Sequence, residues 1–388
     1  MQKMILAILT FISCLLWADV KVEKVLETTS IKEYNQWVKK NKARYPGLKP
    51  YYLKVECIKW GKKWKIYYYN EDGDLWKEEL IEAKPGYWLY VRDYSQWGKI
   101  MIIESDSSLG ESSPIIHTVK NEKGEEIFTF EWGFDYPTLA GVYTLPKGIG
   151  LFRSNAIKNY AELLTWEGKK FGELKDIFSF TINATATPNK KFILLDNERN
   201  AILVENGNER WRKSPSGNLS ISNNGEYISI GSNIEVEGII RVYNSNGDLV
   251  YSYKFSHKGR GRPTSAFSFD NRYLAVGFSG QIALLDNVTG EQIWQKKCEG
   301  SIVSFTKNGN YIVTVDKRAQ KIYLYDILGK LQDTITVPYG EDIEKKRTKE
   351  GKIIEHKVLY SNWTCEVFNN LIITKSTREW HPMIFKIK

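Results

Sequence analysis

The stretch QIALLDNVTGEQIWQKK (residues 281–297) carries the strongest fold signal in the chain. A short apolar run at 282–285 is followed by a polar turn that ends in Gly290, and Trp294 comes four residues later. Apolar and β-branched residues favour a strand, Asp286 can cap the turn, and glycine supplies the positive φ of a tight hairpin. The stretch therefore predicts two antiparallel strands joined by a hairpin.

The same pattern recurs along the chain at a regular interval. An apolar run, a polar turn and a glycine occur at Gly73, Gly124, Gly168, Gly207, Gly247, Gly290 and Gly329. Successive gaps are 51, 44, 39, 40, 43 and 39 residues, and such a period is typical of four-stranded propeller blades. A second polar turn followed by an aromatic recurs before Tyr227, Tyr273 and Tyr311. Two hairpins per unit make four strands, so the chain is predicted to be an all-β propeller.

An aromatic residue follows the turn glycine in most units. The residues at this position are Trp76, Phe128, Trp211, Tyr251 and Trp294. Because they recur with the repeat, we expect them to pack between neighbouring blades.

The number of blades follows from counting strands. Six full blades fit between residues 84 and 337. The remaining strands are expected near 51–58, 64–69 and 75–81 at the front, and near 353–360, 367–374 and 383–387 at the back. They predict seven or eight blades in total. The chain ends on MIFKIK (383–388) with no outer strand after it, so a strand from the N-terminal side, such as VKVEKVLE (20–27), is expected to complete the last blade.

The first 18 residues have the features of a secretory signal peptide. Lys3 precedes an apolar stretch from residue 4 to 17, and Ala18 follows it. That stretch is shorter than the roughly 20 residues that span a bilayer. We expect cleavage after Ala18 and an extracytoplasmic protein, periplasmic or secreted, that does not span the membrane. Lipid attachment at Cys14 is the alternative, although the residues before it make a weak lipobox.

The segment between the signal and the propeller, residues 19–49, breaks the β pattern. Ser30 is a suitable N-cap, and Ile31, Tyr34 and Trp37 lie at helical spacing. We expect one short helix that packs on the rim of a propeller domain spanning residues 50–388.

The repeats also resemble known propeller families. Residues from about 215 to 337 resemble WD-repeat propellers, with Tyr243-Asn244, Leu285-Asp286 and Tyr325-Asp326 in the place of the Trp-Asp pair. The segment ALLDNVTGEQIW (283–294) resembles the PQQ-like, quinoprotein-type repeat, in which a Thr-Gly turn precedes a docking tryptophan. The resemblance implies a propeller architecture and no particular activity. Since one unit alone has this docking pattern in full, no quinone cofactor is expected.

Composition and motifs identify no catalytic residue, metal site or cofactor. Lys plus Arg outnumber Asp plus Glu by 55 to 46, and the charges are mixed along the chain, so no nucleic-acid partner is expected. The four histidines lie in different units, and no nucleophile elbow, phosphate-binding loop or zinc motif occurs. The segment YNEDGDLWKEE (69–79) is interpreted as a hairpin turn and not as a calcium loop. The charged run at 341–357 is interpreted as a solvated loop between strands.

Two features remain as candidate sites. The connection HKGRGRP (257–263) gathers Lys258, Arg260 and Arg262 between glycines, and it is either an anion- or partner-binding loop or a flexible soluble connection. Cys57 and Cys365 lie in the first and last units, which are neighbours in a ring. They form either a disulfide that locks the ring or two buried thiols.

These features favour an exported, monomeric propeller that serves as a rigid binding platform for another protein or an envelope polymer. The alternatives are an extracytoplasmic enzyme, such as a glycan hydrolase or lyase with its site in the central channel, and a small-ligand sensor. A platform predicts an apolar and aromatic patch ringed by polar groups. An enzyme predicts converging carboxylates, histidines or arginines, and a sensor predicts a deep closed pocket.

Overall fold

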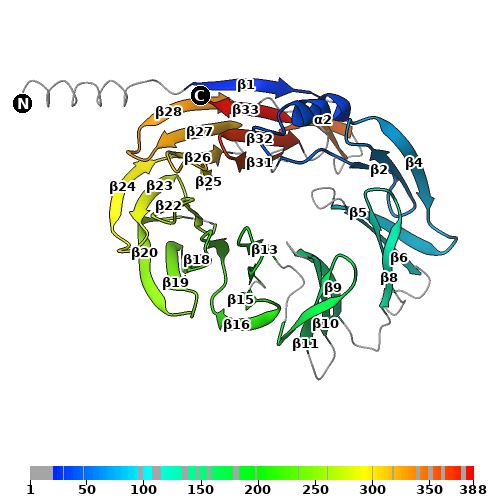
Figure 1. Ribbon diagram of the computed structural model, residues 1–388, viewed down its shortest axis with the longest axis horizontal. Coiled ribbons are helices and arrows are strands. Elements are labelled where there is room, and N and C mark those ends of the chain that lie inside the picture. Colours follow the sequence, from blue (N-terminus) through cyan, green and yellow to red (C-terminus); the bar gives the residue numbers. More distant parts are fainter. Residues whose placement is uncertain are drawn as a thin grey trace, which may run out of the picture.

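The computed structural model describes residues 21–388 apart from a set of short gaps. The gaps are residues 29, 47, 95–98, 107–114, 133–138, 146–147, 155–158, 178–182, 197–198, 235, 260, 299, 317–318, 338–340, 348–352, 360–362 and 377–381. Antiparallel sheets stand around a common centre, and one helix lies between the last sheet and the first (Figure 1). The predicted signal peptide, residues 1–18, which includes Cys14, lies outside the described residues. Over the described part of the chain, no helix has the length and apolar character that a membrane span requires.

Seven of the described sheets have four strands and are the blades of the propeller. Six of them each use four consecutive strands. The first three blades are β5 (Tyr87–Tyr94), β6 (Lys99–Asp106), β7 (Ile115–Asn121) and β8 (Glu126–Trp132); β9 (Leu139–Leu145), β10 (Gly148–Ser154), β11 (Asn159–Thr165) and β12 (Lys170–Lys175); and β13 (Asn183–Ala186), β14 (Phe192–Asp196), β15 (Ala201–Glu205) and β16 (Asn208–Lys213). The next three are β17 (Asn218–Ile221), β18 (Tyr227–Ile234), β19 (Glu237–Asn244) and β20 (Leu249–Lys258); β21 (Thr264–Phe267), β22 (Tyr273–Phe278), β23 (Gln281–Asp286) and β24 (Gln292–Lys297); and β25 (Ser301–Phe305), β26 (Tyr311–Asp316), β27 (Lys321–Asp326) and β28 (Leu331–Thr336). These are the six full blades predicted between residues 84 and 337.

The seventh blade joins the two ends of the chain. It consists of β31 (Trp363–Phe368), β32 (Leu371–Ser376), β33 (Met383–Ile387) and β1 (Val22–Glu27). In the antiparallel pairing of β1 with β33, Val22 lies opposite Ile387 and Glu27 opposite Met383. The predicted closure by an N-terminal strand is therefore confirmed, and it protects the edge of β33.

A shorter sheet of three strands stands beside the first full blade. It contains β2 (Leu53–Lys59), β3 (Lys63–Tyr69) and β4 (Leu75–Glu82), and it lies between the helix and β5–β8 (Figure 1). Its Gly73 turn joins β3 to β4, just as the Gly124 turn joins β7 to β8. By this alignment β2, β3 and β4 occupy the second, third and fourth strand positions of a blade.

The repeated turns have the predicted geometry. All seven repeat glycines have positive φ, between 74° and 91°. In the Asp286–Gly290 turn, Oδ1 of Asp286 accepts from the backbone N–H groups of Val288 and Thr289 at 2.9 and 3.0 Å. The segment at 69–79 is likewise a hairpin turn, in which Asn70 accepts from the backbone of Asp72 and Asp74. The polar residues at these positions are therefore explained by turn formation.

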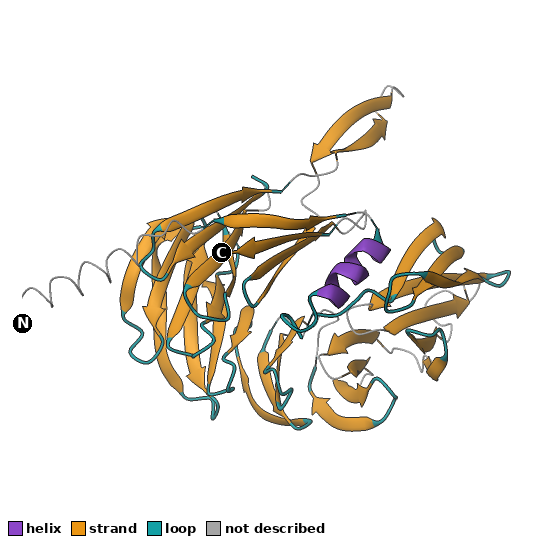
Figure 2. Cartoon of the chain, turned by 45° about the horizontal axis from the view of Figure 1, so that its top comes forward, coloured by secondary structure: helices purple, strands orange, loops and turns teal. Residues whose placement is uncertain are grey.

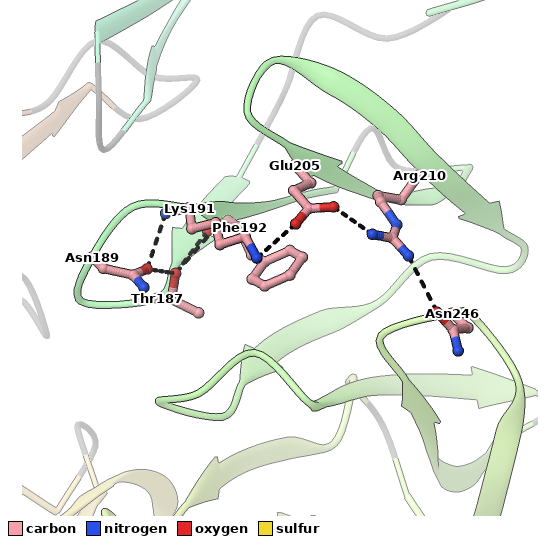
Figure 3. A network of polar contacts seen from close by, with 7 residues as sticks. All are labelled: Thr187, Asn189, Lys191, Phe192, Glu205, Arg210 and Asn246. Atoms are coloured by element: carbon pink, nitrogen blue, oxygen red, sulfur yellow. Dashed lines mark hydrogen bonds and ion pairs between the residues drawn. The ribbon is translucent and has the colours of Figure 1, made fainter.

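The second polar turn of the repeat, predicted before Tyr227, Tyr273 and Tyr311, has a further copy before Phe192. In the Thr187–Phe192 turn, the Thr187 hydroxyl donates to Oδ1 of Asn189 at 2.7 Å and accepts from the backbone N–H of Phe192 at 3.2 Å. Ser222, Ser268 and Thr306 make the same contacts in their blades. Beside the Thr187 turn, the Glu205 carboxylate forms ion pairs with Lys191 and Arg210 (Figure 3). Arg210 also donates to Oδ1 of Asn246 in the next blade at 3.2 Å.

Four of the five predicted docking aromatics lie between blades. A methyl group built on the turn glycine of the following blade would lie 2.6–3.0 Å from the ring of Phe128, Trp211, Tyr251 or Trp294. The prediction for Trp76 is wrong, because its side chain is 51% exposed. In that sheet Tyr68 of β3 lies against the next turn, that of Gly124, and takes the inter-sheet position.

The predicted short helix is α2 (Ile31–Lys40), and Ser30 is its N-cap. Tyr34 and Val38 are buried against Leu371 and Ile384 of the last blade. On its other side, Asn35 donates to the carbonyl oxygen of Tyr51 at 2.8 Å, and Lys32 and Lys39 pair with Asp74 and Asp72 of the β3–β4 turn. The helix therefore bridges the last blade and the three-stranded sheet.

The charged run at 341–357 is not the predicted loop. It forms a hairpin of β29 (Glu341–Arg347) and β30 (Ile353–Leu359), with Glu341 opposite Leu359. The hairpin projects from the body of the ring (Figure 2). The strand predicted near 353–360 thus belongs to this hairpin and not to a blade, and the strand predicted near 367–374 is divided between β31 and β32. The β-branched residues Ile353, Ile354 and Val358 supply the strand propensity that the charges obscured.

Candidate binding surface

Three large aromatic side chains form an exposed cluster where the three-stranded sheet meets the first full blade. We call Trp60, Trp88 and Tyr90 the aromatic patch. Trp60 lies in the turn after β2 and is 66% exposed, and Trp88 on β5 is 39% exposed. The rings of Trp60 and Tyr90 meet edge to face at 5.4 Å, and those of Trp88 and Tyr90 are stacked at 6.3 Å. The patch therefore presents a continuous aromatic surface to solvent.

The backbone beneath the patch is fixed by buried contacts. Trp64 is buried, and its indole N–H donates to the carbonyl oxygen of Leu89 at 2.9 Å. The N–H of Leu89 in turn donates to the carbonyl oxygen of Gly61 at 2.9 Å. A methyl group at Gly61 would lie 2.3 Å from the ring of Trp88, so glycine allows the turn to touch the indole. These contacts fix the backbone next to Trp60 and the ring of Trp88 before any partner binds, which lowers the entropic cost of binding.

Lysines border the aromatic patch. The Nζ of Lys62 donates to the carbonyl oxygen of Tyr87 at 2.7 Å and lies 5.4 Å from the ring of Trp88. Lys63 pairs with Glu82 at 2.6 Å, and Lys84 lies 5.9 Å from the ring of Tyr87. A half-exposed aromatic centre with a polar rim is the arrangement that a binding platform was expected to show.

Strand direction places the patch on the same face of the ring as two other features. Neighbouring strands are antiparallel, so the connections that follow the second and fourth strand positions of each sheet emerge on one face. The β2–β3 turn with Trp60, the 259–263 connection between β20 and β21, and the β29–β30 hairpin between β28 and β31 all belong to this set. This face therefore carries the aromatic patch, the basic connection and the projecting hairpin.

The basic connection is anchored by its backbone. The Asn218 amide donates to the carbonyl oxygens of Arg262 and Pro263 at 2.9 and 3.0 Å, and Asn233 donates to that of Gly261 at 2.9 Å. Arg262 pairs with Asp196 of β14 at 3.2 Å. Lys258 ends β20, but its side chain is not among the described ones, and Arg260 lies outside the described residues. Anion or partner binding by Lys258, Arg260 and Arg262 therefore stays a prediction.

The two cysteines of the proposed bridge lie in neighbouring sheets of the ring. Cys57 is exposed on β2, whereas Cys365 on β31 packs against the cluster between the last blade and β25–β28. The structure does not join the two sulfur atoms. The bridge stays a prediction, and mass spectrometry of the unreduced protein tests it.

One histidine has a strongly shifted pKa, and it lies inside a blade. His117 on β7 is 5% exposed and stacks on Phe130 at 4.6 Å. Burial, which disfavours the charged ring, lowers the pKa of His117 to about 4. This histidine is therefore a neutral core residue at physiological pH.

The aromatic patch was not found in the sequence. Trp60 and Trp88 do not lie three or four residues after a repeat glycine, where a docking aromatic falls. The only sequence signal for the patch is that these two tryptophans do not occupy the docking position of the repeat. Displacement from the docking position makes a tryptophan a candidate for a surface role, but Trp64 and Trp166 are displaced too and are buried in clusters between sheets, so this signal alone does not identify the patch.

Comparisons with known proteins agree with the architecture. No protein-family model and no curated protein matches the chain. Among solved structures, BamB from Moraxella catarrhalis is similar with a TM-score of 0.50 and 10% identity, over 95% of this chain and 98% of that one. The C-terminal WD40 domain of Sif2 is similar with a TM-score of 0.47 and 9% identity, over 87% and 92% of the two chains. At these identities the likeness extends to the fold alone, and the chain is a seven-bladed β-propeller of the WD-repeat and PQQ-like architecture.

Proposed function

We propose that this chain is an exported, rigid platform that binds a partner protein through the face bearing the aromatic patch. The observation that carries the proposal is the exposure of Trp60 and Trp88 on a backbone fixed by Trp64, Leu89 and Gly61. Tryptophan and tyrosine are enriched among the residues that dominate binding energy, especially when they lie at the centre of a surface with a polar rim. A propeller holds such a surface with little internal motion, because each blade packs on its neighbours.

Export is supported by the N-terminal sequence and by the position of β1. The proposed cleavage after Ala18 leaves β1, which begins at Val22, attached to the mature chain. The mature protein would therefore retain the strand that completes its last blade. Mass spectrometry of the protein recovered from the cell envelope should show Asp19 as the first residue. A chain that retains Met1 or carries lipid on Cys14 would contradict simple export.

Partner capture tests the platform. A photo-crosslinking amino acid placed at exposed Lys84, beside the patch, should join the purified propeller to one predominant envelope protein. Trp60→Ala and Trp88→Ala should each lower the crosslinked yield by roughly 10-fold or more, since each removes an aromatic anchor. Trp76→Ala is the matched control, because Trp76 is equally an exposed tryptophan but lies on β4 away from the patch. Equal losses in all three variants, or no loss in any, would contradict the proposal.

A further inference from the structure

The three-stranded sheet has an open inner edge, unlike the four-stranded blades. Because the Gly73 turn aligns β3 and β4 with the third and fourth strands of a blade, β2 holds the second position. Within the described residues, β2 pairs with β3 alone. Every four-stranded sheet has a further strand on the corresponding side of its second strand. The inner side of β2 is therefore the place in the ring where one more strand can be added.

The backbone of β2 directs alternate peptide groups toward this open edge. The N–H of Tyr69 donates to the carbonyl oxygen of Tyr52 at 2.9 Å, so Tyr52 and Tyr69 form a hydrogen-bonded pair. Hydrogen-bonded and non-hydrogen-bonded pairs alternate along antiparallel strands. In the register that places Leu53 opposite Tyr68, the N–H and C=O groups of Leu53, Val55 and Cys57 face away from β3. These groups are the donors and acceptors that an added strand would use.

The side chains of β2 leave the edge accessible, and Lys54 and Lys59 outweigh Glu56, so that the strand carries a net positive charge. Lys54 and every residue from Glu56 to Lys59 are exposed. The Glu56 carboxylate accepts a hydrogen bond from the Tyr67 hydroxyl at 2.6 Å. Lys54 and Lys59, near the two ends of the strand, have no carboxylate partner in the described part of the chain. A cavity of about 300 Å³ opens beside the start of the strand, and its lining includes Lys54 and the ion pair of Lys32 with Asp74.

The charge of the edge selects its occupant. Two copies of this chain paired through β2 would bring together two strands that each carry a net positive charge, and lysine on an edge strand is a common protection against such pairing. A strand that carries aspartate or glutamate would instead pair with Lys54 and Lys59 across the sheet, where opposite charges are favourable. Trp60 follows Lys59 directly, so the edge is continuous with the aromatic patch.

We propose that β2 accepts an extended, acidic segment of the partner protein as the inner strand of the three-stranded sheet. The proposal rests on the platform function and names its mode of binding. Main-chain hydrogen bonds from Leu53, Val55 and Cys57 provide affinity, and the lysines provide specificity, as in other cases of strand addition. The adjoining aromatic patch then packs against the part of the partner that follows the strand.

A synthetic strand tests the proposal with the full mature chain. The probe is the fluorescein-labelled peptide acetyl-EVEVDVEV-amide, and the same peptide with lysine at every acidic position is its counterpart. We expect the acidic peptide to bind at least 10-fold more tightly than the basic one in fluorescence anisotropy. It should also slow hydrogen exchange at the amides of Leu53, Val55 and Cys57, which no contact with the solvent face of the sheet would do.

Two substitutions separate the edge backbone from its side chains. Cys57→Pro removes an N–H that faces the edge, and it should weaken binding of the acidic peptide at least 10-fold. Cys57→Ala keeps that N–H and should bind like the native protein. Because Cys57→Pro can also disturb the strand, the double variant Lys54→Glu with Lys59→Glu provides an independent measurement. It should reverse the preference, so that the basic peptide binds more tightly.

The outcomes also separate this inference from the platform function. Failure of the acidic peptide to bind, equal binding of the two peptides, or an unchanged preference in the double variant would overturn strand addition. If partner crosslinking is lost in Trp60→Ala and Trp88→Ala but survives the charge reversal of β2, the platform stands and strand addition is wrong. If crosslinking is unchanged in the two tryptophan variants while the acidic peptide still binds β2, the aromatic patch is not the binding surface, and strand addition at β2 is supported.

Discussion

The indole of Trp294 lies directly against Gly329 of the following blade. A methyl group on Gly329 would be 2.9 Å from the Trp294 ring, and the indole N–H donates to the carbonyl oxygen of Ile327 at 2.8 Å. Trp211 meets Gly247 in the same way and donates to Ser245 at 3.1 Å. One aromatic ring and one glycine turn thus form a standard joint between blades. The repeat period of the sequence is the spacing of these joints.

The joint predicts which tryptophans stabilise the ring. Trp211 is buried to 9% exposure, so Trp211→Ala should lower the free energy of unfolding by about 3 kcal/mol through lost burial and the cavity left behind. Trp211→Phe should cost about 1 kcal/mol, since it keeps a ring but loses the hydrogen bond to Ser245. Urea unfolding followed by circular dichroism measures both. Trp76→Ala is the control and should change stability by less than about 1 kcal/mol, and a cost for it like that of Trp211→Ala would contradict the joint.

The glycine side of the joint can be tested with a matched pair. Gly290 has φ of 74°, and a methyl group there would lie 2.6 Å from the ring of Tyr251. Gly280 has φ of 85° and nothing within 4 Å of the same position. Gly280→Ala should cost about 1 kcal/mol from backbone strain alone. Gly290→Ala adds displacement of a packed ring and should cost roughly 1–3 kcal/mol more. Equal midpoints in the thermal unfolding of the two variants would show that packing of the Tyr251 ring against the Gly290 turn contributes little to stability.

The repeated part of the fold was predictable because its signals are local. Each hairpin is encoded by a polar turn, a glycine and flanking apolar residues within about 15 positions, and those signals recur six more times. Trp76 occupies the docking position in sequence yet is exposed, because the neighbouring turn at Gly124 packs on Tyr68. Which of two nearby aromatics meets the next blade depends on the orientation of whole sheets. The repeat pattern does not carry that information.

The candidate surface depends on non-local relationships in the same way. Trp60 and Trp88 become a patch because β2 lies beside β5, and the exposed edge arises because β2 has one partner strand among the described residues. Neither fact follows from the residues of β2 themselves. The closure by β1 was predictable, since an unfinished blade at one end of the chain and a leftover strand at the other are each visible in sequence.

The strand that closes the ring should be required for solubility as well as stability. Removing residues 1–27 deletes β1 and leaves β33 as an edge with exposed N–H and C=O groups. We expect a lower melting temperature and concentration-dependent association in light scattering. The control is a chain that begins at Asp19, which retains β1 and should behave as the mature protein. A monomeric, equally stable protein without β1 would show that the pairing with β33 contributes little.

The buried histidine predicts how stability depends on pH. The pKa of His117 is about 4 in the folded protein, against 6.5 for an exposed histidine. As the pH falls below about 6.5, the unfolded chain takes up a proton that folded His117 does not, so the unfolded state is favoured. The loss grows until the pH reaches about 4 and amounts to about 3 kcal/mol, at about 1.4 kcal/mol for each pH unit. His117→Phe keeps the stacking on Phe130 and removes this proton, so its unfolding free energy should fall less between pH 7 and 4. Carboxylates titrate in both proteins, so the difference between the two pH profiles is the measurement. Parallel profiles would mean that His117 is protonated as readily in the folded chain as in the unfolded one.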